Sequence, residues 1–124
     1  MTDKHMLLAS GVLGLIGVGA GAFGAHGLRE RLSDDMMRVF QTGVLYHLLH
    51  AVILAVTAAL AGRFASAYLS AAAWLFIVGI VLFSGSLYFL ALAEAKLVGV
   101  ITPIGGLCLM GGWACLIAAA TRAP

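Results

Sequence analysis

Four long apolar stretches dominate the sequence and limit the folds that it can adopt. They cover residues 6–25, 40–61, 71–93 and 97–120, and each is close to the ~20 residues that a helix needs to cross a bilayer. The chain of 124 residues has only seven basic and five acidic side chains, and 63% of it is hydrophobic. Because so few charges cannot cover a soluble globule, the sequence excludes a soluble domain and predicts a membrane protein.

The predicted fold is one all-α domain over residues 1–124, with the lipid bilayer as its surroundings. Backbone groups find no water partners in lipid, and the Leu-, Ala- and Gly-rich stretches favour helices over barrel strands. Ser33, Asp34 and Asp35 are typical of a helix start, because serine caps a helix and acids favour its positive end. Since the links are short, we expect an up-down-up-down four-helix transmembrane bundle.

The charges also exclude one class of partner. The net charge is only +2, and no run of basic residues is long enough to hold a phosphate backbone. We therefore expect no nucleic-acid partner.

Small residues recur along the first apolar stretch at spacings of three and four. They are Ser10, Gly14, Gly17, Gly21 and Gly24. This spacing places them on one helix face and lets another helix approach closely, as in a GxxxG motif. The pattern predicts a packing face whose partner is either another helix of the same chain or a second copy in a homo-oligomer.

Polar side chains inside the apolar stretches indicate where a site lies, because each is costly in lipid unless it finds a partner. Tyr46, His47 and His50 lie within about one turn of the second stretch and should face protein. Side chains of the third and fourth stretches are expected to supply their partners. The predicted polar pocket comprises His26, Tyr46, His47, His50, Ser84, Tyr88, Thr102 and Pro103.

Four interpretations of the histidines remain open at this point. They can tie helices together by hydrogen bonds, or form a proton relay or polar cavity, since histidine changes charge near neutral pH. Metal binding would need further donors from His26, Cys108 or Cys115. Haem binding would need an axial ligand from another helix. We assign no metal or other cofactor from the sequence and expect the two cysteines to be packing residues.

Pro103 is expected to interrupt the fourth stretch. Proline lacks an amide donor and clashes with the carbonyl of Gly99, so it should bend the helix and free that carbonyl for another partner. Broken helices at membrane depth can line cavities. The alternative is a bend that only improves the fit between helices.

Motifs for catalysis do not occur in the sequence. It contains no HExxH, GxSxG or Walker A pattern, and all five carboxylates lie at or beyond the ends of the apolar stretches. The sequence therefore predicts a protein that is not an enzyme.

Four segments follow one another in a distinctive order. They are Gly-Ala-Phe-Gly-Ala-His-Gly-Leu at 21–28, Thr-Gly-Val-Leu-Tyr-His-Leu-Leu-His-Ala at 42–51, Phe-Ser-Gly-Ser-Leu-Tyr at 83–88, and Ile-Thr-Pro-Ile-Gly-Gly at 101–106 with Gly112-Trp113. Together they resemble the DUF423 family of small bacterial inner-membrane proteins, and the resemblance extends to the eukaryotic transmembrane protein 256 group. The resemblance covers nearly the whole chain and implies a multi-pass protein of the bacterial plasma membrane. It implies no reaction or cofactor, because the family is uncharacterised.

The sequence favours a non-enzymatic membrane protein whose polar pocket binds or passes a small solute, a proton or a lipid group. The small-molecule ligand is not identified. One alternative is an accessory or scaffold protein that docks onto a larger membrane assembly through its glycine face. Metal or haem binding is a third hypothesis.

Overall fold

Helices form the whole fold in the computed structural model, which describes residues 1–123 apart from the side chain of Leu97. No strand occurs among these residues. In chain order the elements are α1 (Asp3–Gly27), α2 (Asp34–Ala61), α3 (Ala67–Gly79), the π-helical η1 (Ile80–Ser84), α4 (Gly85–Ala93), the 3-10 helix η2 (Lys96–Val100) and α5 (Ile101–Thr121).

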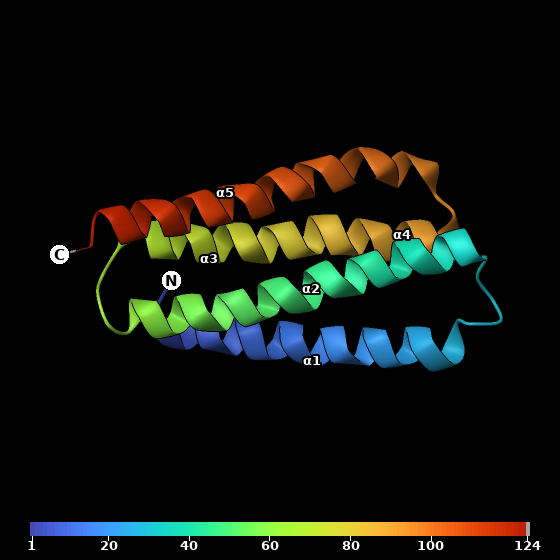
Figure 1. The fold of residues 1–124 in the computed structure, drawn as a ribbon, viewed down its shortest axis with the longest axis horizontal. Helices are drawn as coiled ribbons and strands as arrows, with labels where there is room; N and C mark the ends of the chain where they lie inside the picture. The colour runs from blue at the N-terminus through green and yellow to red at the C-terminus, as the bar shows by residue number, and fades with distance from the viewer. Residues whose placement is uncertain (124) are drawn as a thin grey trace.

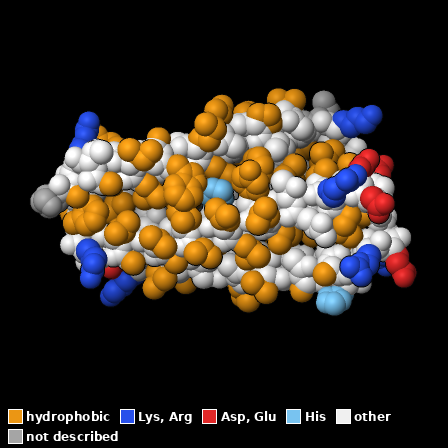
Figure 2. Space-filling view, viewed as in Figure 1, with side chains coloured by type: hydrophobic (Ala, Val, Ile, Leu, Met, Phe, Trp, Pro, Cys, Tyr) orange, Lys and Arg blue, Asp and Glu red, His pale blue; other side chains and the backbone are white. Residues whose placement is uncertain are grey.

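Four helical segments are long and apolar enough to cross a membrane. They are Asp3–Gly27, Asp34–Ala61, Ala67–Ala93, which joins α3, η1 and α4, and Val98–Thr121. Figure 2 shows apolar side chains over the middle of the molecule and the charged side chains at its two ends. This distribution matches a hydrocarbon core between two polar boundaries, and the predicted all-α transmembrane fold is confirmed.

The start of α2 follows the predicted capping pattern. Ser33 has an extended backbone, and its hydroxyl accepts a hydrogen bond from the Met36 amide at 3.2 Å. Asp34 and Asp35 occupy the first turn, where the helix dipole favours negative charge. The 28 residues of α2 span about 42 Å, more than the ~30 Å of a hydrocarbon core. The surplus length places the ends of α2 at the membrane boundaries.

The four spans alternate in direction and lie side by side in chain order (Figure 1). Each extensive helix contact joins spans that are consecutive in the sequence: α1 with α2, α2 with the α3–α4 span, and that span with α5. The up-down-up-down order is therefore confirmed. Because the α3–α4 span lies between them, α2 and α5 form no extensive contact with each other.

Glycines bring α5 close to the third span. Leu109 packs against Gly79, and the ring of Phe76 packs against Gly112. At Gly105 an added Cβ would overlap the backbone of Phe83, so only glycine permits this approach. Phe76 and Leu109 also belong to the central buried cluster, with Ala72 and Ile80. The contact between α3 and α5 therefore fixes one wall of the site described below.

The third span contains a π-helical turn that the sequence pattern did not predict. In η1 the amide of Gly85 donates to the carbonyl of Ile80, five residues earlier. A π-turn inserts one extra residue and rotates the side chains that follow it. Phe83 and Ser84 lie within this turn, and their positions depend on it.

The structure corrects the prediction that Pro103 interrupts the interior of the fourth helix. The 3-10 segment η2 precedes α5, and Pro103 is in the first turn of α5 instead of the interior of a long helix. Proline is tolerated there because the first amides of a helix have no intrahelical partner. The irregularity thus falls at the start of the fourth span.

Candidate functional site

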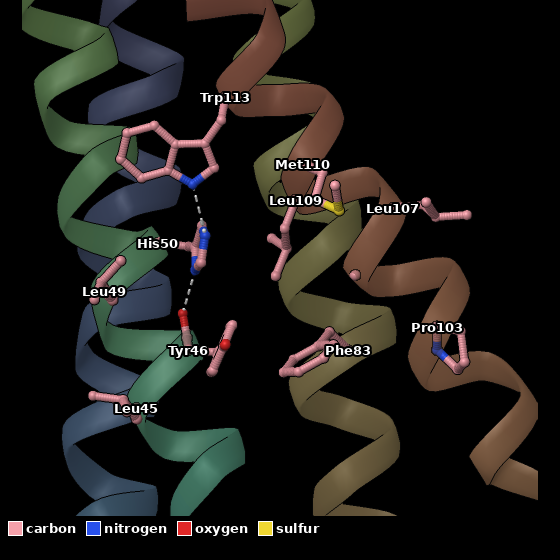
Figure 3. Close-up of a pocket in the computed structure, with 11 residues that line it drawn as sticks. Leu45, Tyr46, Leu49, His50, Phe83, Pro103, Leu107, Leu109, Met110 and Trp113 are labelled. Carbon is pink, nitrogen blue, oxygen red and sulfur yellow. Dashed lines mark hydrogen bonds between the residues drawn. The ribbon is translucent and has the colours of Figure 1, made fainter.

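A groove of about 750 Å³ separates α2 from α5. Figure 3 shows Leu45, Tyr46, Leu49 and His50 along its α2 side. The α5 side and the floor are formed by Pro103, Gly106, Leu107, Leu109, Met110, Trp113 and, from η1, Phe83. Volumes of this size are typical of small-molecule sites.

Four aromatic rings line part of the groove. The ring of Tyr46 lies 4.6 Å from that of Phe83 and 5.9 Å from the imidazole of His50, centroid to centroid. Trp113 meets His50 edge-on, with ring centroids 6.2 Å apart. Three spans therefore contribute flat rings to one cavity.

His50 is held in a defined orientation between Trp113 and Tyr46, as Figure 3 shows. Its Nδ1 lies 2.7 Å from the Tyr46 carbonyl oxygen, and its Nε2 lies 3.2 Å from the indole Nε1 of Trp113. A carbonyl only accepts and an indole N–H only donates. In the neutral ring Nδ1 therefore carries the proton, and Nε2 accepts from Trp113.

His47 lies one turn away but bonds to different neighbours. Its Nε2 is 2.7 Å from the Leu13 carbonyl oxygen, and its Nδ1 is 2.8 Å from the Tyr88 hydroxyl. By the same argument, Nε2 carries the proton and donates to Leu13, while Tyr88 donates to Nδ1. The two histidines thus adopt opposite tautomers, and His47 links α1, α2 and α4.

The nitrogen atoms of both imidazoles are engaged in these hydrogen bonds. A metal ion bound to either ring would have to displace the Trp113, Tyr88 or carbonyl partner, because a ligand nitrogen must offer its lone pair. Among residues 1–123, no three His, Cys, Asp or Glu side chains are grouped as a metal site would require. Cys108 and Cys115 are free thiols of intermediate exposure.

Thr102 forms a separate polar contact beside the groove. The Ser86 hydroxyl donates to the Phe83 carbonyl at 2.8 Å, and the Thr102 hydroxyl lies 2.6 Å from Ser86 Oγ. Because Ser86 has one proton, Thr102 is the donor between the two hydroxyls. This bond ties the start of α5 to α4, next to Pro103.

Ser84 and His26 do not bond to the histidines of α2. Ser84 is fully buried, and its hydroxyl finds no partner within residues 1–123. His26 is exposed at the end of α1, beside Arg29 and Arg31. The eight residues of the predicted pocket are therefore divided among several places, and only Tyr46, His50 and Pro103 line the groove.

The glycine face of α1 packs only in part within the chain. Gly17 meets Leu48, and Gly24 meets the ring of Phe40, both on α2. Gly21 is near Val44, whereas an added Cβ at Gly14 would meet nothing within 4 Å. Ser10 Oγ donates to the Ala51 carbonyl at 2.8 Å. The buried members of this face are therefore spaced seven residues apart, at Ser10, Gly17 and Gly24.

Sequence reasoning missed two residues that shape the groove. It assigned neither Trp113 nor Phe83 to the site, although both belong to the segments that carry the family resemblance. The available signal was the polar indole N–H, which needs a partner in an apolar span. Nothing in the spacing of Phe83 indicated that a π-turn would place it opposite Tyr46.

Fold and groove together define a multi-pass membrane protein with a cavity between its transmembrane helices. The chain belongs to the family described as a protein of unknown function, DUF423, whose family model matches residues 20–106. The resemblance to the DUF423 family inferred from the sequence is therefore confirmed.

Similar proteins are found in several bacteria. The chain is 41% identical to the UPF0382 membrane protein YwdK of Bacillus subtilis, covering 96% of this chain and 98% of the relative. It is 38% identical to the UPF0382 inner membrane protein YgdD of Escherichia coli, covering 98% and 93%. No solved structure matches significantly. With its four spans, the chain is accordingly a multi-pass protein of the bacterial inner membrane.

Proposed function

We propose that this protein is a non-enzymatic binding protein for a molecule dissolved in the bilayer, which enters the α2–α5 groove sideways. The observation that carries the proposal is a groove of small-molecule size in the middle of the membrane spans. The sequence left three kinds of ligand open: a small solute, a proton and a lipid group. Of these, the proposal selects the lipid group.

The exposed side chains along the groove support entry from lipid. Leu107 and Met110 on α5 are 67% and 68% exposed, and Leu45 on α2 is 59% exposed. All of them lie within spans, so acyl chains surround the opening. An apolar rim at this depth suits a lipophilic ligand, because a charged or strongly hydrated solute would have to cross hydrocarbon to reach it.

The hydrogen bonds of the histidines support a binding role over a relay. His47 and His50 bond to different neighbours, and neither is bonded to the other or to Ser84. His50 fixes the orientation of Trp113, a side chain of the groove wall. Hydrogen bonds that hold wall residues in place keep a cavity preformed, which lowers the cost of binding.

The test compares two glycine substitutions. Gly106 lines the groove, and an added Cβ there would make only ordinary contacts with Phe83, whereas Gly19 on α1 has open space around it. Purified protein is incubated with a bacterial total lipid extract, washed, and its retained lipophiles are quantified by mass spectrometry. We expect the native chain and Gly19→Leu to retain a molecule that Gly106→Leu loses. Equal retention by all three proteins would refute the proposal.

A further inference from the structure

The hydroxyl of Tyr46 is a polar group without a hydrogen-bond partner in the part of the chain that the structure describes. The backbone carbonyl of Tyr46 accepts from His50, but no hydrogen bond to its hydroxyl is formed by any group in residues 1–123. The side chain is 41% exposed and lines the groove. Since a hydroxyl in hydrocarbon costs free energy unless it is bonded, a groove ligand with an acceptor atom would be favoured here.

The position of Tyr46 along α2 limits which acceptors can reach it. Tyr46 lies about 2 Å from the midpoint of the helix Asp34–Ala61 and about 7 Å from the midpoint of its apolar stretch 40–61, from the rise of 1.5 Å per residue. Its ring is held at this level by Phe83 and His50, and Figure 3 shows it beside Phe83. The ring of Tyr46 therefore lies inside the hydrocarbon core, several ångströms short of its boundary.

Phospholipids do not carry an acceptor at this depth. Their ester and phosphate oxygens lie at the edges of a hydrocarbon core that is about 30 Å thick, about 15 Å from its centre. An acyl chain could fill the groove but would leave the Tyr46 hydroxyl unbonded. A ligand that satisfies Tyr46 must carry its acceptor on a part of the molecule that dissolves in the bilayer interior.

The shape of the groove adds a second restriction. The rings follow one another along the groove in the order Phe83, Tyr46, His50 and Trp113, with successive centroids 4.6, 5.9 and 6.2 Å apart. Aromatic surfaces favour a flat, conjugated ligand ring in offset or edge-on contact. The remaining lining, including Leu45, Leu49 and Met110, is aliphatic or thioether and suits a hydrocarbon tail.

We propose that the ligand is a quinone with a lipophilic tail, whose ring carbonyl accepts a hydrogen bond from the Tyr46 hydroxyl. This inference rests on the proposed function, because it names the class of molecule that the groove takes up. The quinone ring lies against Phe83 and Trp113, and its tail extends between α2 and α5. The proposal concerns binding alone and includes no electron transfer.

Trp113 provides a direct measurement of quinone binding. The chain has two tryptophans, so Trp74→Phe leaves Trp113 as the only indole, and quinones quench indole fluorescence on contact. The protein is placed in phosphatidylcholine nanodiscs and titrated with decyl-benzoquinone. We expect quenching that saturates, and Gly106→Leu should leave only the linear quenching caused by quinone in the surrounding lipid.

A matched pair of tyrosine variants tests the hydrogen bond. Tyr46→Phe removes only the hydroxyl and should raise the half-saturating concentration about fivefold, the value of one ordinary hydrogen bond. Tyr68→Phe makes the same chemical change at the end of the molecule, where Tyr68 bonds to Arg122, and should have no effect. An unchanged half-saturation in Tyr46→Phe would overturn the assigned contact.

The quinone inference and the proposed function can fail separately. Linear quenching by the native chain would overturn the quinone assignment. If Gly106→Leu nevertheless lost a molecule retained from the lipid extract, the binding function would stand with a ligand of another class. Equal retention in that assay, together with linear quenching, would refute both.

Discussion

His47 and His50 lie one turn apart on α2, yet they belong to two regions of different character. His47 faces a closed region, where it bonds to Leu13 of α1 and Tyr88 of α4. His50 faces the open groove, where it bonds to Trp113 and to its own helix. The same type of side chain therefore ties spans together in one region and orients a residue of the cavity wall in the other. Burial alone does not separate them, since they are 3% and 4% exposed.

The largest expected difference in stability is between two adjacent glycines of α5, of which one lies in a close helix contact and the other faces the groove. A Cβ at Gly105 would overlap the backbone of Phe83, which cannot move aside as a side chain can. Gly105→Ala should therefore lower the free energy of unfolding by about 3 kcal/mol. Gly106→Ala points into the groove and should change it by less than about 1 kcal/mol, in the stabilising direction.

Unfolding of both variants in mixed micelles by titration with sodium dodecyl sulfate, followed by helical circular dichroism, measures this difference. If the two alanine variants proved equally stable, the close contact of α5 with η1 would be wrong.

An intermediate effect is expected in the closed region. His47→Leu removes two hydrogen bonds between spans and should cost about 1.2 kcal/mol, whereas Tyr88→Phe removes one and should cost about 0.6 kcal/mol. Because the two side chains are partners, the double variant should cost less than the sum, by about 0.6 kcal/mol or more. The same unfolding measurement applies, and strictly additive losses would contradict the His47–Tyr88 hydrogen bond.

The smallest effect on stability is expected at the groove. His50→Leu removes the acceptor of the Trp113 N–H and should cost only about 0.6 kcal/mol. Its main effect should be on Trp113, whose emission, measured in the Trp74→Phe background, should move to shorter wavelength because the indole N–H loses its partner. A loss of stability as large as that of His47→Leu, with unchanged emission, would show that His50 ties spans together as His47 does.

The sequence predicted the parts of the site that depend on a single helix. The cost of polar groups in lipid correctly indicated that His47 and His50 find partners inside the protein. Their division between two regions was not predictable, because residues 47 and 50 are neighbours on the helix surface, and small rotations of adjacent spans decide which one each imidazole meets. The sequence also placed Ser84 among their partners, whereas its hydroxyl finds no partner within residues 1–123.

By itself, the sequence determined the four spans, their alternating order and the family, because the length of an apolar stretch and a helix cap such as Ser33 act locally. Tertiary structure alone decided that α2 and α5 stand apart, with Phe83 and Trp113 completing a groove between them. The physical reason is that helix association in lipid depends on how closely side chains fit, and here Gly105 and Gly112 bring α5 onto the third span and away from α2.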